Sequence, residues 1–535
     1  MYNVVFPLLK AYNYPAVFAP VTGWLDTPAN QKIAYADKML DRSVFATWSQ
    51  VKEMEQSGLV EIASHTHNLH NGINANPSGG QLPSVIAPEY KNGKYETEDA
   101  YKNRLKSDFT RTVQTLVNHI GKKPRVMVWP YGQFNDVSVQ IARQAGMPHY
   151  FSLGEKIVNK VGDKHIGRLL LNAETDLNTV KNYLDGIDES KQIQRVLHVD
   201  LDYVYDADKA QQAKNLDKLI DRIYRYGVTT VYLQAFSDPD GDGVADALYF
   251  PNKYLPVRDD IFGRIAWQLQ TRAGVQVYAW MPVLAFDLRK GVKEAEYVID
   301  SRTGKTSTKA YLRLSPYNKQ NVEIIKSIYN DLSFYAKFNG ILFHDDAFLT
   351  DFEGAEGDHA EGMVSPQAKQ KTQDLIQLTH QLTDALKPYF LRGSYSLKTA
   401  RNLYASVITN PNAEEWLAQN LKTLTDNYDT TAIMAMPYME NEQPISQKEA
   451  YQWFASLIEN VKAQAPLEKV LFEFQAVNWR TQKPIPESEL IDWMTLLQKN
   501  HIYSYGYYPD NFLTNQPDMN KMKPYFSVNT NAGKQ

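Results

Sequence analysis

The 535-residue sequence contains no cysteine, no long apolar run and little net charge. The absence of cysteine excludes disulfide scaffolds, thiolate zinc sites and cysteine nucleophiles. Because no stretch of about 18 consecutive apolar residues occurs, no segment is expected to cross a membrane as a helix. Lysine and arginine number 57 against 61 aspartates and glutamates. This balance gives no global basic field, and nucleic acid is not an expected partner.

The first residues also lack the features of a secretory signal peptide. They have no basic start, Lys10 interrupts the apolar residues, and no small-residue cleavage site follows. The pattern predicts instead a helix over Val4–Tyr12 and then a strand over Ala16–Pro20. Since this order is the middle of a β-α-β unit, we expect the first strand of the N-terminal domain to be missing.

Aromatic residues are the most informative part of the composition. They make up 12% of the chain, with 34 tyrosines and 9 tryptophans. Aromatic rings stack on the C–H faces of sugars while a polar edge stays in water. Most rings in a tyrosine-rich protein lie in its core, so composition alone is compatible with a carbohydrate ligand without identifying one.

Strand-like and helical patterns alternate over residues 1–187, which predicts an α/β domain with parallel strands. The segment Asn71–Tyr95 is rich in Asn, Gly, Pro and Ser and is predicted to be a long loop. The polar stretch 183–193 is predicted to separate this domain from the next. The remaining predicted strands are Val60–Ser64, Arg125–Trp129, His149–Leu153 and Arg168–Asn172, and the remaining helices are Thr47–Ser57, Glu98–Ile120 and Asp136–Ala145.

Residues 194–535 are predicted to form a (β/α)8 barrel of the TIM type. Eight apolar strand patterns occur in this region, most of them separated by helical patterns such as Lys209–Tyr226 and Gln320–Lys337. The predicted strands are Arg195–Val204, Thr229–Phe236, Val275–Val283, Gly340–Asp345, Tyr389–Ser396, Thr431–Pro437, Val470–Val477 and Ser504–Pro509.

Acidic and aromatic residues follow the carboxyl ends of these strands, which is where barrel enzymes carry their chemistry. Rings could stack on hexose units, and carboxylates could bind ammonium or hydroxyl groups. The sequence therefore predicts a sugar-binding groove that contains Asp200, Asp202, Tyr203, Trp280, Tyr438, Trp479, Tyr507, Tyr508 and Asp510.

Two motifs in the N-terminal domain indicate a candidate metal site. Ser64 to His70 holds three of the chain's 11 histidines, and imidazole is the commonest ligand of zinc. A strand beginning at Arg125 runs into Pro130-Tyr131-Gly132. Together these motifs resemble two motifs of the NodB-type polysaccharide deacetylases. The resemblance implies that His65 and His70 are metal ligands and that Pro130 and Tyr131 line the substrate groove.

The resemblance also implies an Asp-Asp pair that supplies the general base and the third metal ligand. In the family this pair comes just before a stretch that matches Tyr2 to Pro7. The pair is absent from the sequence, so we expect an N-terminally incomplete domain and a defective deacetylase. The metal implied is divalent, with zinc expected and nickel, cobalt and iron as alternatives.

Longer motifs in the barrel resemble the PgaB/HmsF family of poly-β-1,6-N-acetyl-D-glucosamine N-deacetylases. The matching segments include residues 195–206, 278–283, 340–347, 434–438 and 505–512. The resemblance implies partial deacetylation of a biofilm polymer, and a barrel that binds the product. It also implies a lipoprotein at the periplasmic face of the Gram-negative outer membrane, working with an export porin.

The family's acidic cluster after the fourth barrel strand corresponds to Asp345, Asp346 and Asp351, which are the predicted catalytic residues of the barrel. Three functions remain open at this point. The barrel could cleave the polymer as an endo-glycosidase, or the chain could bind and escort the polymer without catalysis. A chitinase-like hydrolase is the third, but the spaced glutamate that such enzymes carry does not follow His344-Asp345-Asp346.

Overall fold

The computed structural model describes residues 1–35, 38–153, 158–172, 175–185, 193–354, 364–392 and 396–528. The chain forms two compact units. Unit 1 comprises Met1–Asp188 and Lys387–Ser396, and unit 2 comprises Glu189–Leu386 and Leu397–Gln535. Within the described residues, no helix is long and apolar enough to cross a membrane.

Unit 1 is built on parallel strands. β1 (Ala16–Phe18) pairs with β4 (Val60–Ile62), and β9 (Val126–Val128) lies in a second sheet of order β11-β10-β9. A parallel bridge between Ser64 and Met127 joins β4 to β9. The predicted parallel α/β arrangement is therefore confirmed. The last strand was predicted too late, since β10 (His149–Leu153) is followed by β11 (His165–Arg168).

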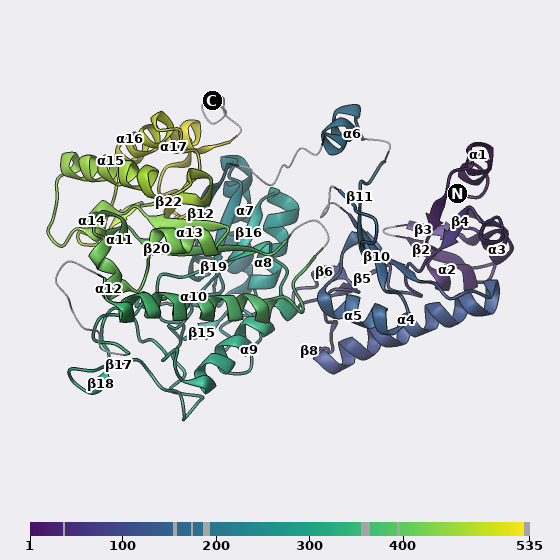
Figure 1. The fold of residues 1–535 in the computed structure, drawn as a ribbon, viewed down its shortest axis with the longest axis horizontal. Helices are drawn as coiled ribbons and strands as arrows, with labels where there is room; N and C mark the ends of the chain where they lie inside the picture. The colour runs from purple at the N-terminus through teal and green to yellow at the C-terminus, as the bar shows by residue number, and fades with distance from the viewer. Residues whose placement is uncertain are drawn as a thin grey trace. The chain divides into compact units, whose positions relative to one another are not determined.

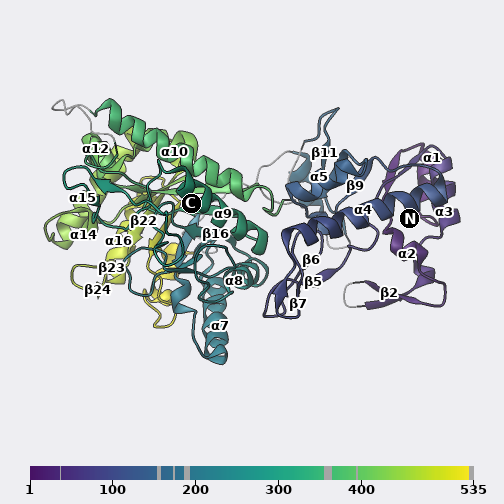
Figure 2. The same ribbon diagram turned by 90° about the horizontal axis from the view of Figure 1, so that it is seen from below.

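The helices of unit 1 follow their sequence signals closely. The long helix α4 begins after Thr97, whose hydroxyl accepts from the amide of Ala100, and it ends at Gly121 with a left-handed φ of 76°. Figure 2 shows α4 running along the unit. The helices are α1 (Val5–Tyr12), α2 (Thr22–Asp26), α3 (Trp48–Gln56), α4 (Glu98–Ile120), α5 (Asp136–Gln144) and α6 (Leu177–Leu184).

Short hairpins interrupt the region that was predicted to be a long loop. Two antiparallel pairs lie within residues 71–95, and another pair lies between α2 and α3. These strands are two to four residues long, too short to show a period in the sequence. They are β5 (Gly72–Asn74) with β6 (Gln81–Pro83), β7 (Tyr90–Lys91) with β8 (Lys94–Tyr95), and β2 (Lys32–Tyr35) with β3 (Lys38–Asp41).

Unit 2 is a closed barrel of eight parallel strands, as predicted (Figure 1). Pairing of the first and last strands, with Leu197 opposite Tyr507, closes the barrel. The strands are buried along almost their whole length, as expected for a parallel sheet covered by helices. They are β12 (Arg195–Val199), β13 (Thr230–Gln234), β16 (Gln276–Met281), β19 (Gly340–Phe343), β20 (Lys398–Tyr404), β21 (Thr430–Met434), β22 (Val470–Gln475) and β25 (Tyr505–Tyr508).

The predicted fifth strand, Tyr389–Ser396, is wrong. Its described residues belong to unit 1, where the backbone of Arg392 pairs with that of Phe134. The true fifth strand is β20. The apolar pattern does not predict β20 because two polar side chains, Arg401 and Asn402, interrupt it. Both are buried in the barrel.

Helices surround the barrel strands, as Figure 1 shows. In α7 (Lys209–Tyr226), the buried residues Leu216, Leu219, Ile220 and Ile223 recur at helical spacing and form one apolar face. The other long helices are α9 (Lys319–Tyr335), α10 (Pro366–Leu386), α15 (Gln447–Gln464) and α16 (Glu487–Lys499), and shorter ones are α8 (Phe262–Gln268), α13 (Leu421–Asn427), α14 (Pro437–Glu440) and α17 (Met519–Phe526).

Candidate functional site

The histidine motif of unit 1 begins just after β4. The Nδ1 atom of His65 lies 2.6 Å from the carbonyl oxygen of Val128 on β9, so Nδ1 carries the proton that is donated. Burial lowers the pKa of His65 to about 4. His65 is therefore neutral near pH 7, and its Nε2 lone pair is available as a metal ligand.

His70 lies beside His65 and beside the predicted groove residues. The two imidazole centroids are 4.9 Å apart, and the ring of Tyr131 is 4.5 Å from His70. Tyr131 has a left-handed φ of 58° and follows the buried Pro130. The structure thus brings together all four residues that the motifs selected in unit 1.

His67 has a different role in the same loop. Its Nδ1 atom lies 2.9 Å from the hydroxyl of Thr22, and its backbone amide donates to the carboxylate of Asp108. The amide of Asn68 donates to the other oxygen of Asp108. These contacts fix the loop so that its first and last histidines can meet.

The pair formed by His65 and His70 fits two ligand positions of a divalent metal. A catalytic zinc ion takes three protein ligands and a water. Across the described ranges, the one group of three metal-capable side chains whose ligand atoms lie within 4.8 Å of one another is Asp238, Asp240 and Asp242 in unit 2. Among the described residues, no carboxylate lies close enough to His65 and His70 to complete a set of three metal ligands.

An apolar pocket of about 140 Å³ lies next to His65. Its walls come from the end of β1, from α2 and from the segment before α3, and they include Phe18, Trp24, Leu25 and Phe45. A pocket with apolar walls and the predicted metal ligand His65 at its edge has room for a small apolar group.

Asp345 is the central carboxylate of the barrel mouth. It follows β19 and is only 5% exposed. The hydroxyls of Tyr311 and Tyr404 each donate to its Oδ2 atom at 2.9 Å. The Nε2 atom of His344 lies 3.0 Å from Oδ1. These neighbours hold the carboxylate in one orientation at the end of the strand.

Asp346 has an entirely different environment, which corrects its prediction as a catalytic residue. Its carboxylate accepts hydrogen bonds from the backbone amides of Val283, Leu284 and Ala285, and it is fully buried. Both aspartates lie in the turn that follows β19, where Asp346 holds the loop after β16 and Asp345 contacts Tyr311 and Tyr404. Asp351 lies half-buried in the following turn, and its catalytic role stays a prediction.

Aromatic rings line the mouth next to Asp345. The ring of Trp280 lies 5.2 Å from His344 and 5.4 Å from Tyr508, and Tyr508 lies 6.1 Å from Trp479. His198 contacts both Trp280 and Tyr508 and is held from the far side by Glu473, at 2.6 Å. The predicted stacking residues Trp280, Trp479 and Tyr508 are thus contiguous.

Two further carboxyl groups at the strand ends are protonated more readily than usual. Burial raises the pKa of Asp200 to about 8, with the charges of Asp202 and Asp238 adding to the effect. Burial raises the pKa of Glu440 to about 7, and the charge of Asp345 contributes. Carboxyl groups with separated pKa values suit a site that needs an acid and a base.

The other predicted acids and tyrosines of the mouth are held by protein partners. Asp202 is paired with Arg258 and accepts a hydrogen bond of 2.6 Å from Tyr249. The hydroxyl of Tyr438 donates to Glu489 at 2.6 Å, and its ring stays half-buried. Tyr203 is half-buried in the turn that follows β12.

Tyr507 and Asp510 are structural, which corrects their prediction as substrate-binding residues. Both are fully buried. Asp510 pairs with Arg222 of α7 at 2.6 Å and accepts from the hydroxyl of Tyr507 at 2.7 Å. The ring of Tyr507 packs on Phe526 of α17. Neighbouring strand residues alternate between the two faces, so Tyr508 lies against Trp280 and Trp479 while Tyr507 faces the helices.

Sequence reasoning missed Tyr311 and Tyr404, which both bind Asp345. Tyr311 lies on a long connection between β16 and α9 with no recognisable motif. Tyr404 is the last residue of β20, so it was lost when the fifth strand was misplaced. A correct strand assignment would have identified Tyr404 as a residue of the barrel mouth.

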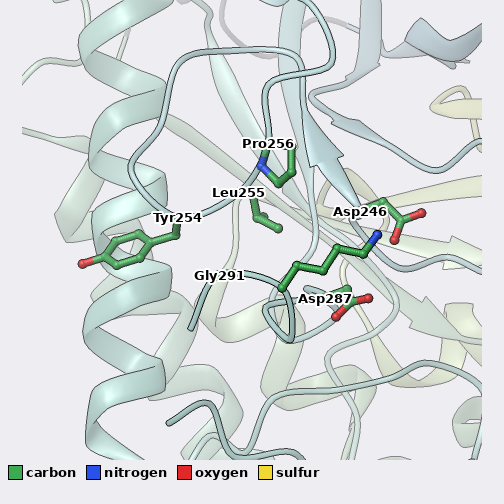
Figure 3. A pocket seen from close by; sticks show the side chains of 7 residues that line it. Asp246, Tyr254, Leu255, Pro256, Asp287 and Gly291 are labelled. Atoms are coloured by element: carbon green, nitrogen blue, oxygen red, sulfur yellow. The ribbon is translucent and has the colours of Figure 1, made fainter. Parts of the chain in front are cut away.

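A second hollow, of about 220 Å³, lies between the segments of unit 2 around β15 (Ala247–Leu248) and the loop that follows β16. Figure 3 shows the carboxylates of Asp246 and Asp287 on one side of it and the ring of Tyr254 on the opposite side. Asp287 pairs with Arg289 at 2.8 Å. The hollow has no aromatic strip like the one beside Asp345.

The fold, the histidine pair of unit 1 and the barrel mouth of unit 2 define a two-unit hydrolase that acts on polysaccharides. Residues 1–150 match the polysaccharide deacetylase family, and residues 198–508 match hypothetical glycosyl hydrolase family 13. Polysaccharide deacetylases of this type are generally metal-dependent.

The particular family follows from similarity to whole proteins. The chain is 40% identical to the poly-β-1,6-N-acetyl-D-glucosamine N-deacetylase of Escherichia coli K12, over 98% of this chain and 81% of that protein. It also resembles the PgaB (BpsB) glycoside hydrolase domain of Bordetella bronchiseptica, with 39% identity, a TM-score of 0.58, and coverage of 63% of this chain and 100% of that one. The chain belongs to the family of PgaB-like poly-β-1,6-N-acetyl-D-glucosamine N-deacetylases.

A more distant relative is the poly-β-1,6-N-acetyl-D-glucosamine N-deacetylase of Staphylococcus aureus MSSA476. It is 26% identical over 35% of this chain and 56% of that protein. Family membership supports an enzyme and gives no support to the alternative of a non-catalytic export module.

Proposed function

We propose that this protein removes N-acetyl groups from poly-β-1,6-N-acetyl-D-glucosamine during biofilm formation, and that its barrel binds the partly deacetylated polymer. The single observation that carries the barrel half is the environment of Asp345. Its carboxylate contacts His344, whose ring lies against Trp280, and the ring contacts continue from Trp280 to Tyr508 and Trp479. Such a site can stack on hexose rings and bind the ammonium group that deacetylation creates.

The deacetylase half rests on family membership and on the pair formed by His65 and His70, while the general base and the third metal ligand that the resemblance implies are not in the sequence given. A divalent metal at these imidazoles would polarise the acetyl carbonyl and activate water when bound. Zinc is the metal we expect, and nickel, cobalt and iron are alternatives. His65 offers Nε2 because Val128 holds its Nδ1 proton, Tyr131 contributes a ring beside His70, and the apolar pocket next to His65 takes the methyl group.

Cleavage of the polymer by the barrel is part of the proposal. Glycoside hydrolysis uses one protonated and one ionised carboxyl group. Asp200 and Glu440 are protonated more readily than usual, whereas Asp345 accepts hydrogen bonds from two tyrosine hydroxyls at the barrel mouth. Asp345 is therefore the residue we assign to charge stabilisation in an endo-glucosaminidase reaction.

The cellular setting is proposed from the resemblance of the sequence to its family. The protein would act at the periplasmic face of the Gram-negative outer membrane as a lipoprotein. Its partners would be the polymer and an export porin of the same system.

Substitution of Asp345 by Asn tests the barrel site. The change removes a charge-assisted contact worth about 1.5–3 kcal/mol, so affinity for a β-1,6-linked glucosamine oligomer should fall at least about tenfold. Affinity for the fully acetylated oligomer should change little. Titration calorimetry measures both, and polymer shortening measured alongside separates binding from cleavage.

Asp221→Asn is the matched control, because Asp221 is an exposed acid on α7 with 60% of its side chain accessible. It should leave both affinities unchanged. Equal binding of the glucosamine oligomer by the wild type and Asp345→Asn would contradict the proposed function.

A further inference from the structure

The loop 238–243, which comes after β13, lies against Tyr311, one of the two tyrosines that bind Asp345. At its end, Gly243 has a left-handed φ of 77°. A Cβ atom at this position would overlap Cε1 of Tyr311 and would lie 2.6 Å from Cδ1 of the same ring. Only glycine therefore lets the loop approach the tyrosine ring this closely.

Hydrogen bonds fix the loop on both sides of this contact. The carboxylate of Asp238 accepts from the backbone amide of Gly243 at 2.9 Å, and the amide of Asp238 donates to Asp202 at 3.0 Å. Two residues after the glycine, the amide of Ala245 donates to the carbonyl of Ala285 at 2.9 Å. The loop therefore cannot withdraw from the tyrosine without breaking hydrogen bonds.

The segment that carries Tyr311 is fixed as well. Two residues further on, the fully buried Arg313 pairs with Glu353 at 2.6 Å and donates to the carbonyl of Phe348 at 2.6 Å. The ring of Tyr311 lies 5.6 Å from that of His344 and 6.2 Å from that of Phe348. Because both backbones are held, a Cβ atom at position 243 would displace the side chain of Tyr311 itself.

We propose that Gly243 is a positioning residue of the barrel site, because the close contact that it allows holds the hydroxyl of Tyr311 on Asp345. The hydroxyls of Tyr311 and Tyr404 both donate to the Oδ2 atom of Asp345 at 2.9 Å. A carboxylate that loses one of these donors is less well ordered, so it pays more entropy when it binds an ammonium group. The inference rests on the proposed function and traces its binding of deacetylated sugar to a residue without a side chain.

Gly243→Ala and Gly241→Ala form a matched pair that tests this role. Gly241 lies in the same loop with a φ of 74°, and a Cβ atom there would meet no atom within 4 Å. Both substitutions impose similar backbone strain, but only Gly243→Ala displaces Tyr311. In titration calorimetry with a β-1,6-linked glucosamine oligomer, Gly243→Ala should bind about fivefold more weakly than Gly241→Ala. Equal affinities of the two variants would overturn the inference.

A double variant shows whether the glycine acts through the tyrosine hydroxyl. Tyr311→Phe lacks this hydroxyl and should also bind about fivefold more weakly than the wild type. In Gly243→Ala/Tyr311→Phe, the loss should stay near fivefold, since the same hydrogen bond is already gone. A loss of about 25-fold, the product of the two, would mean that Gly243 acts through another contact and would overturn the inference.

A second pair of variants loosens the loop instead of crowding it, and it decides the question if Gly243→Ala does not fold. Asp238→Ala releases the amide of Gly243, whereas Asp240→Ala removes the same charge from an exposed side chain of the loop. Binding of the oligomer should be about fivefold weaker in Asp238→Ala than in Asp240→Ala. Equal binding by these two variants would count against the proposed role of the loop.

A ligand-free measurement distinguishes the inference from the proposed function. In spectra of protein labelled with carbon-13 at tyrosine Cζ, the Tyr311 signal is assigned by its absence in Tyr311→Phe. This signal should move in Gly243→Ala and should stay in place in Gly241→Ala, and a signal that is unmoved in both would overturn the inference. Protein that shows the expected signals but whose wild type binds no glucosamine oligomer would overturn the proposed function instead.

Discussion

Three aspartates at the barrel mouth differ in what they can do because their partners differ. Asp345 receives tyrosine hydroxyls, Asp346 receives backbone amides, and Asp510 is paired with a buried arginine. The sequence identified all three, because acids after barrel strands are a strong signal. It could not sort them, because the direction of each side chain depends on where its strand ends.

Asp200 gives a prediction at the scale of one residue. Its folded pKa of about 8 lies above the ordinary value of 3.8, so the folded protein binds this proton more tightly than the unfolded chain does. The stability that the proton provides is complete below pH 3.8 and is lost as pH rises to 8. Asp200→Asn removes this loss. Between pH 5 and 8, the free energy of unfolding of the variant should therefore rise relative to that of the wild type by about 1 kcal/mol per pH unit.

Urea unfolding followed by tryptophan fluorescence at pH 5 and pH 8 measures this difference. Asp221→Asn, in which an exposed acid is changed, should track the wild type at both pH values. Stability curves of Asp200→Asn and wild type that stay parallel across this range would show that Asp200 ionises normally in the folded protein.

At the scale of elements, the sequence predicted seven of the eight barrel strands and the long helices around them. Regular apolar periods allowed this, as in α7 with its buried face. The fifth strand, β20, was missed because it buries Arg401, which donates to Tyr428 and to the carbonyl of Ala347. Burial of a paired arginine depends on contacts between distant segments, which a local pattern does not contain.

The closure of the barrel between β12 and β25 gives a prediction for Gly506. A Cβ atom at this position would lie 2.6 Å from the carbonyl oxygen of Val196 and 2.8 Å from its Cβ atom. Gly506→Ala must therefore push the two strands apart, at a cost of about 1–3 kcal/mol in the free energy of unfolding. Thermal unfolding of the barrel measures the loss.

Val196→Gly in the same background identifies the clash, because it removes the Cβ atom of Val196 and leaves the carbonyl oxygen. The closest atom is a backbone oxygen, so trimming the side chain should restore little stability. Full recovery in the double variant would mean that side-chain crowding alone excludes alanine from this strand.

At the scale of the whole molecule, each ligand should stabilise only the unit that binds it. Added zinc should slow hydrogen exchange around His65 and His70, whereas a glucosamine oligomer should slow exchange around Asp345. At a ligand concentration ten times its Kd, the stabilisation is about 1.4 kcal/mol. Exchange measured by mass spectrometry on peptides from both units records both effects.

His70→Ala is the variant that discriminates between the two effects. It should abolish the response to zinc and leave the response to the oligomer intact. A zinc response that survives in His70→Ala would place the metal elsewhere, with the exposed carboxylates of Asp240 and Asp242 as the first position to examine.

The segment Lys387–Ser396 has a consequence for how the protein can be divided. The chain passes from one unit to the other at 188/189, at 386/387 and at 396/397. Inside unit 1, Arg392 pairs with Asp136 at 3.0 Å, and the amide of Val137 donates to the carbonyl of Pro388. A protease cut or a gene truncation near residue 190 therefore does not yield two intact halves. The N-terminal fragment would lack the segment Lys387–Ser396, which belongs to its own unit, and the C-terminal fragment would carry that segment without the unit it packs in.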